Sequence, residues 1–125
     1  MILNLTQHEA TPGQIAAGVV EPADKAAVQA ALTFDTLPHP GQVHTRAETL
    51  AQFARMSGCR SAMIGGAPFL MAELDKCLLA WGVRPLYAFS VRVSTEQIQP
   101  DGSVRKVATF QHAGFVGLEF CEVDE

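Results

Sequence analysis

The chain has 125 residues, 48% of them hydrophobic and 18% charged, which is typical of a globular protein with one core rather than of a disordered chain. Its formal net charge of −4 argues against the broad basic face that long DNA or RNA requires, and no apolar run approaches the ~20 residues of a membrane-spanning helix. The amino-terminal residues lack the basic-then-apolar pattern of a signal peptide, and the three cysteines include no Cys-x-x-Cys pair. We therefore expect one cytoplasmic domain over residues 1–125, with reduced thiols and no membrane segment.

The first half of the chain predicts short strands and helices in alternation. Thr11 and Pro12 suit the N-cap and first position of a helix, and Gly18 is placed to end it. Apolar residues at spacings of three and four predict a longer helix that ends before Gly58. The expected elements are a strand at 1–6, a helix at 11–17, a strand at 19–20, an alanine-rich helix at 23–32, a proline-containing loop at 36–41 and a helix at 43–57.

The second half predicts a parallel strand pair followed by a hairpin. A strand at 62–64, a helix at 69–81 and a strand at 85–92 follow one another, and this βαβ pattern requires a parallel pair with a right-handed crossover. Residues 91–98 and 104–115 alternate around a turn that contains Pro100 and Gly102. We therefore expect an α/β fold, with a small parallel sheet, flanking helices and an antiparallel C-terminal hairpin.

A ligand site is predicted at the carboxyl edge of this sheet, where ligands of open α/β sheets bind. Gly65, Gly66 and Ala67 lie between a strand and a helix, where backbone N–H groups can approach an anion, although a tight turn alone also needs such glycines. Ser90 and Arg92 begin the polar half of the fourth strand, and an ordinary surface ion pair is the alternative for Arg92.

Two histidines complete this group. His8 follows the first strand and His112 lies on the returning strand of the hairpin. For each histidine we expect a structural role at least as much as a catalytic one, because an imidazole forms hydrogen bonds in a protein core as readily as it takes part in catalysis. His39 and His44 are expected at the surface.

Two other kinds of chemistry find little support in the sequence. No Gly-x-Ser-x-Gly elbow occurs, and the cysteines lack an activating neighbourhood, which argues against a nucleophilic hydrolase. The acidic residues Glu48, Glu73 and Asp75 belong to helices with solvated faces. We therefore predict no metal site and no cofactor.

Several segments resemble the small stand-alone CRISPR-associated Rossmann-like (CARF-like) proteins. The resemblance covers both ends and the middle of the chain but not residues 22–60. Departures from the family pattern are Phe89, where a second hydroxyl residue is usual, and the absence of an acidic residue from the glycine turn. The segments that carry the resemblance are residues 85–92, Glu96, Asp101-Gly102, 110–115, Gly65-Gly66, and Asn4, His8, Thr11 and Gln14.

The resemblance implies a Rossmann-like fold that binds a cyclic oligoadenylate, with or without slow metal-independent cleavage of the ring. It would use Arg92, Ser90 and His8 for catalysis and Asn4, Thr6, Gly65, Gly66, Ala67 and His112 for ligand binding. Orientation of a ribose 2′-hydroxyl for in-line attack and stabilisation of phosphoryl charge suffice for such cleavage. We expect a homodimer, because a two-fold-related ring is most simply bound across an isologous interface. A non-catalytic nucleotide-binding module and a structural homodimer of phage or mobile-element origin remain the alternatives.

Overall fold

The computed structural model describes residues 1–117. The elements, in chain order, are β1 (Ile2–Leu5), α1 (Pro12–Ala16), β2 (Val19–Val20), α2 (Lys25–Leu32), α3 (Pro40–Ser57), β3 (Ser61–Ile64), α4 (Pro68–Ala80), β4 (Arg84–Ile98) and β5 (Val104–Gly117). This order confirms the predicted alternation of strands and helices.

The described residues form one five-stranded mixed sheet in the order β2-β1-β3-β4-β5. β1 pairs in parallel with both β2 and β3, and β3 pairs in parallel with β4. β5 closes the sheet antiparallel to β4, and its register places Ile98 opposite Val104. The predicted parallel strands and C-terminal hairpin are therefore confirmed.

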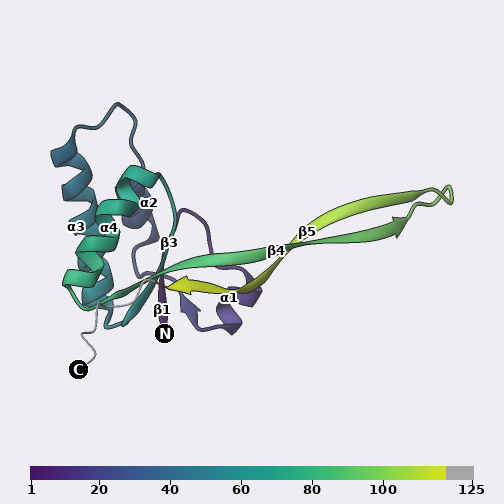
Figure 1. Ribbon diagram of the computed structural model, residues 1–125, viewed down its shortest axis with the longest axis horizontal. Coiled ribbons are helices and arrows are strands. Elements are labelled where there is room, and N and C mark those ends of the chain that lie inside the picture. The colour runs from purple at the N-terminus through teal and green to yellow at the C-terminus, as the bar shows by residue number, and fades with distance from the viewer. Residues whose placement is uncertain (118–125) are drawn as a thin grey trace, which may run out of the picture.

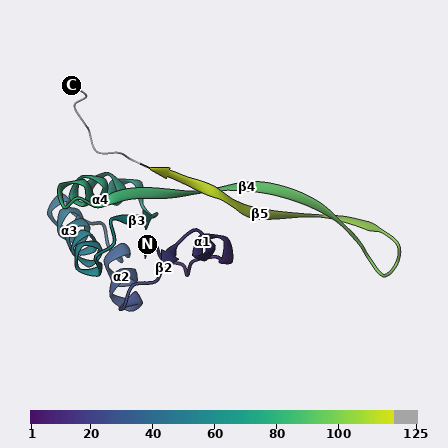
Figure 2. The same cartoon turned by 90° about the horizontal axis from the view of Figure 1, so that it is seen from below.

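The main core lies between one face of the sheet and the helices α2, α3 and α4. Leu5 and Ile64 point into it from the strands, and Leu50 and Leu74 point into it from α3 and α4. Figure 2 shows these three helices gathered together, with the short α1 apart from them beside the base of the hairpin. Among the described residues, no helix has both the length and the apolarity that a membrane crossing requires.

The hairpin extends far beyond the rest of the sheet (Figure 1). We call its outer part, residues 89–114, the hairpin arm. A register shift between Phe89 and Ser90, where Gly114 and His112 are the successive partners, leaves Ala113 as an extra residue of β5 and marks the base of the arm. The arm exposes several large apolar side chains, namely Phe89, Val91, Ile98, Val104 and Phe110.

Most elements begin and end within two residues of the predicted bounds, and α3 and β4 differ more. α3 begins at Pro40 rather than at residue 43, because His39 acts as its N-cap: the His39 Nδ1 accepts a hydrogen bond from the Gly41 N–H at 3.1 Å. The Gln42 side chain accepts from the His39 N–H in return, so the last two residues of the expected loop belong to the first turn of the helix. The strands predicted at 85–92 and 91–98 form a single strand, β4, because nothing interrupts their alternation.

Candidate functional site at the carboxyl edge of the sheet

A cavity of about 600 Å³ lies where the parallel strands end. We call it the carboxyl-edge pocket. Residues 6–9 after β1, 63–66 at the end of β3, and Tyr87 and Ala88 of β4 line it, together with Thr11 and Gln14 from the start of α1. The structure thus brings the ends of β1 and β3 together beside Tyr87 and Ala88, whereas β4 itself continues to Ile98, so the predicted third strand end is absent here.

The loop that follows β1 is held by the buried side chain of Asn4. Its Nδ2 donates to the carbonyl oxygen of His8 at 2.8 Å and to the Glu21 carboxylate at 3.0 Å. Its Oδ1 accepts from the backbone N–H of Thr6 at 3.0 Å. Asn4 is completely buried, and these contacts use both donors of its amide. Asn4 therefore shapes the pocket through the loop and has no donor left for a ligand.

Lys25 secures the same loop from α2. Its Nζ donates to the carbonyl oxygens of Thr6 at 2.8 Å and His8 at 2.9 Å, and lies 3.1 Å from the Glu21 carboxylate. An ammonium group has three N–H donors, and these three contacts use all of them. Lys25 therefore stabilises the loop that forms the pocket wall and has no N–H donor left for a ligand.

Glu21 joins these groups into one network. Besides Asn4 and Lys25, it accepts a hydrogen bond from the backbone N–H of Ala10 at 2.9 Å. Burial raises the pKa of the Glu21 carboxyl, but the hydrogen bonds from Asn4, Ala10 and Lys25 outweigh burial, so the pKa lies below its ordinary value. The carboxylate form therefore holds the loop at neutral pH. The predicted site residues did not include Glu21 and Lys25, although their spacing of four residues next to a strand end was the available signal.

The opposite wall is the turn from β3 into α4. Gly66 has a φ of 155°, a conformation that side chains disfavour, and a Cβ there would lie 3.4 Å from the Met71 Cε. Among the described residues, no side chain caps the amino end of α4, whose N-cap position is Ala67. The positive end of this 13-residue helix therefore borders the pocket at Gly66 without a protein side chain bound to it.

Tyr87 lines the β4 side of the pocket, and its side chain connects β4 to α4. Its hydroxyl donates to the Asp75 carboxylate at 3.2 Å. Burial, and then the negative charge of Asp75, raise the pKa of Tyr87 to about 12. Tyr87 is therefore neutral over the physiological range and braces the pocket wall as a hydrogen-bond donor.

Ser90 and Arg92 lie farther out than the pocket lining. Both are exposed on the hairpin arm, opposite His112 and Phe110 respectively. Strand alternation puts them on the same face as Ala88, which lines the pocket, and the rise of about 3.3 Å per residue places Arg92 roughly 13 Å beyond Ala88. Ser90 and Arg92 can therefore make their predicted contact only with a ligand that extends out of the pocket along the arm.

His112 lies at the base of the arm against α1. Its ring is 4.8 Å from that of Phe115, and a Cβ on Gly13 would come within 3.0 Å of its own Cβ. Its Nδ1 is buried and has no hydrogen-bond partner among the described residues. His112 therefore holds α1, and with it Thr11 and Gln14, next to the pocket, while its predicted ligand contact stays a prediction.

The donor set of the pocket suits a polar or anionic organic ligand. Its lining offers the exposed His8 imidazole and amide N–H groups of Gln7 and Gln14, beside the Glu9 carboxylate. The Thr6 hydroxyl already donates to the Asn4 Oδ1 at 2.6 Å. Among the described residues, the one grouping of at least three metal-ligating side chains lies elsewhere, between α3 and α4.

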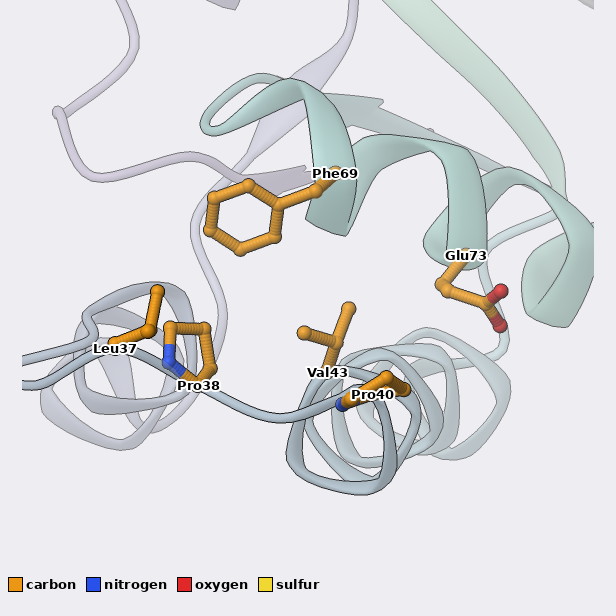
Figure 3. A pocket seen from close by; sticks show the side chains of 6 residues that line it. All are labelled: Leu37, Pro38, Pro40, Val43, Phe69 and Glu73. Atoms are coloured by element: carbon orange, nitrogen blue, oxygen red, sulfur yellow. The ribbon is translucent and has the colours of Figure 1, made fainter.

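A second, smaller cavity of about 370 Å³ lies between the segment before α3 and the start of α4 (Figure 3). Leu37, Pro38, Pro40, Val43 and Phe69 make its walls apolar, and the Glu73 carboxylate stands at its rim. It has none of the convergent polar groups that orient a ligand, so the carboxyl-edge pocket is the better candidate.

A comparison with protein-family models matches residues 1–116 to the Uncharacterized protein MJ1673 family. No curated protein and no solved structure matches the chain. The matched region includes the whole sheet except Gly117, the last residue of β5, and every residue of the carboxyl-edge pocket. The chain therefore belongs to the MJ1673 family.

Proposed function

We propose that the carboxyl-edge pocket binds a phosphate-bearing nucleotide, with a cyclic oligoadenylate as the leading candidate. The observation that carries the proposal is the position of the pocket, between the carboxyl ends of β1 and β3 and beside the uncapped amino end of α4. From β1 the chain adds β2 on one side and then β3 on the other. Such a switch of direction is where doubly wound, Rossmann-like sheets bind nucleotides, and the strand order supports this assignment.

The volume of the pocket indicates how a cyclic ligand would be bound. Pockets of roughly 300–1,000 Å³ accommodate small organic ligands, and 600 Å³ is enough for one part of a nucleotide ring. The rest of a larger ring would extend along the hairpin arm, where Ser90 and Arg92 lie on the pocket side. Arg92 would then bind phosphate through its planar guanidinium, and the Gly65–Gly66 turn would contribute backbone N–H groups.

A homodimer follows from the same proposal. A two-fold-related ring is most simply bound across an isologous interface. Phe89, Val91 and Phe110 are more than 40% exposed on the arm, and a second copy of the chain would cover them. A structural homodimer without a ligand is the second candidate function, favoured by these exposed side chains. The predicted cytoplasmic location belongs to the proposal as well.

Calorimetric titration with cyclic oligoadenylates of several ring sizes, and with linear AMP, tests the proposal. Gly65→Val is the blocking variant, because Gly65 has an ordinary φ and a Cβ there would meet only the Thr6 methyl group, at 3.7 Å. We expect binding by the wild type and loss of binding in Gly65→Val, with an unchanged melting temperature. Absence of any heat or thermal shift with every ring size would overturn the nucleotide proposal and favour the structural homodimer.

Arg92 has a matched control on the same arm. Arg92→Ala should weaken binding by about 30- to 150-fold, equivalent to 2–3 kcal/mol, and Arg92→Lys should recover only part of it. Arg105→Ala removes another exposed arginine, whose strand partner Gln97 lies nearer the tip, and should leave affinity unchanged. Equal affinities for Arg92→Ala and the wild type would remove Arg92 from the site. Product analysis after long incubation with the ring then separates cleavage from binding alone.

A further inference from the structure

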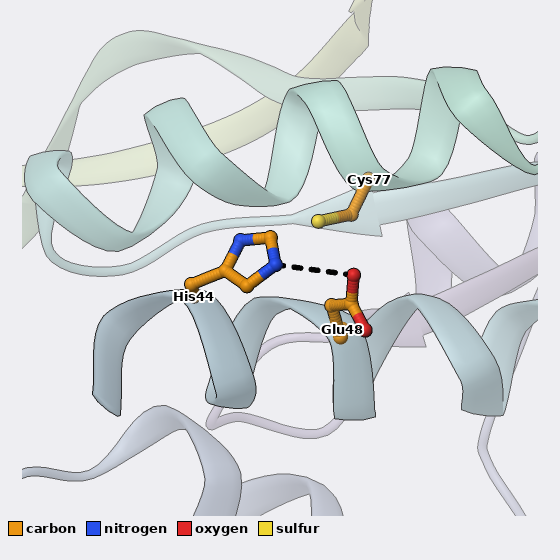
Figure 4. Close-up of side chains that lie close together, drawn as sticks. All are labelled: His44, Glu48 and Cys77. Atoms are coloured by element: carbon orange, nitrogen blue, oxygen red, sulfur yellow. Dashed lines mark ion pairs between the residues drawn. The ribbon is translucent and has the colours of Figure 1, made fainter. Parts of the chain in front are cut away.

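A group of metal-ligating side chains lies between α3 and α4, remote from the carboxyl-edge pocket lining. His44 and Glu48 are one turn apart on α3, and Cys77 faces them from α4 (Figure 4). The His44 nitrogen, a Glu48 oxygen and the Cys77 sulfur all lie within 4.8 Å of one another. Three different donor types from two packed helices therefore converge on one point.

The distances are close to those of a metal centre. Zinc bonds of about 2.0–2.3 Å place tetrahedral ligand atoms roughly 3.3–3.8 Å apart. The His44 Nε2 and the Glu48 Oε1 are already 3.2 Å apart. A movement of about 1 Å, within the range of a side-chain rotation, would bring the Cys77 sulfur to the same spacing.

A fourth side chain is placed to orient the histidine. The Oε2 of Glu73, one turn before Cys77 on α4, lies 3.3 Å from the His44 Nδ1. A carboxylate on one imidazole nitrogen holds the proton there and directs the lone pair of the other nitrogen at a metal, as in carboxylate–histidine–zinc arrangements. Glu73 therefore acts through His44 rather than as a ligand.

The charges and the exposure also suit a cation. Glu48 and Glu73 bring two carboxylates to the group, whereas Lys76 is 3.8 Å from Glu73 and is 77% exposed. Cys77 is buried, but the His44 and Glu48 side chains are 57% and 58% exposed. An ion could therefore enter from solvent and keep a water molecule as its fourth ligand.

We propose that His44, Glu48 and Cys77 bind a divalent transition-metal ion, with Zn²⁺ as the best match to nitrogen, oxygen and sulfur ligands. The ion binds the lone pair of the His44 Nε2, replaces the proton of the Cys77 thiol and joins α3 to α4. The site is independent of the nucleotide proposal, since none of these residues lines the carboxyl-edge pocket.

Titration of the untagged, chelator-treated chain with Co²⁺ tests the site, because thiolate-bound tetrahedral cobalt has a sulfur-to-metal charge-transfer band and strong visible bands. We expect both in the wild type, and displacement of Co²⁺ by Zn²⁺. Cys77→Ser should lose the charge-transfer band, whereas Cys59→Ala and Cys121→Ala should keep it. His44→Ala should weaken Co²⁺ binding by at least 100-fold and Glu73→Gln by about 10-fold.

Each result decides the question. No charge-transfer band in the wild type, or the same band in Cys77→Ser, overturns the proposal. If Cys77→Ser does not fold by circular dichroism, His44→Ala decides, because the exposed His44 can be replaced without disturbing the core. Unchanged Co²⁺ affinity in His44→Ala would mean that His44 forms only surface ion pairs, with Glu48 and with Glu73, and binds no metal.

Discussion

Replacement of Asn4 by Ala tests whether the carboxyl-edge pocket depends on a buried amide. The change removes the hydrogen bond to the Glu21 carboxylate, worth about 1.5–3 kcal/mol, and leaves the His8 carbonyl and the Thr6 N–H each without one partner. Lys25 still binds the His8 carbonyl, which limits the loss there. We expect a decrease of about 3 kcal/mol in the free energy of unfolding, or roughly 10 °C in melting temperature.

Urea denaturation of matched variants measures this decrease. Gln29→Ala is the control, because its Nε2 also donates to a carbonyl of the same loop, that of Gln7, at 2.9 Å, but from an exposed side chain. We expect a change below about 1 kcal/mol there. Asn4→Asp keeps the side-chain shape but places a second carboxylate against Glu21. Its loss in free energy of unfolding should therefore be large at neutral pH and smaller in acid, because a protonated carboxyl group can again donate a hydrogen bond. A decrease below 1 kcal/mol for Asn4→Ala would refute the proposed role of the network.

Three further outcomes follow from the same geometry. Gly66→Ala should cost about 1–3 kcal/mol, because its φ of 155° disfavours a side chain, whereas Gly65→Ala should be nearly neutral; equal effects in urea denaturation would contradict this. Because the pKa of Glu21 is lowered in the folded protein, its ionised carboxylate stabilises the fold fully above the ordinary pKa of 4.5, and this stabilisation is lost as the pH falls through the lowered pKa. The difference in free energy of unfolding between wild type and Glu21→Gln should therefore shrink in acid. Sedimentation should show a dimer that Phe110→Arg dissociates without a change in protomer melting, since Phe110 is 75% exposed; a monomeric wild type would count against the homodimer.

The elements that local chemistry determines could be predicted from the sequence. Thr11 is the N-cap of α1, as expected, and Gly58 ends α3 in the left-handed conformation. The turn at Pro100–Gly102 sets the hairpin register, with Asp101 accepting from the Ser103 N–H at 2.9 Å. Each of these signals acts over a few residues, so the printed sequence contains it in full.

The parts that depend on tertiary packing could not be predicted in this way. Alternation identifies β4 as a strand but does not say where its parallel partner ends, so it did not show that Ser90 and Arg92 lie beyond the pocket on the arm. The contact between His44 and Glu73 joins residues 29 positions apart and exists only because α3 packs on α4. A solvated helix face and one half of a metal site have the same local sequence pattern.

The helix α4 connects the two proposed sites and also explains why they can be tested separately. The turn before it borders the carboxyl-edge pocket at Gly66, and the helix provides Glu73 and Cys77 roughly one and a half to two and a half turns after its start. Tyr87 holds it to β4 through Asp75, and its core residues Leu70, Leu74 and Leu78 pack on the sheet whether or not an ion is bound. Because this packing already fixes the orientation of α4, loss of the metal ligands should leave the pocket wall in place. A variant that abolishes Co²⁺ binding therefore says nothing against the nucleotide proposal, and a blocked pocket says nothing against the metal.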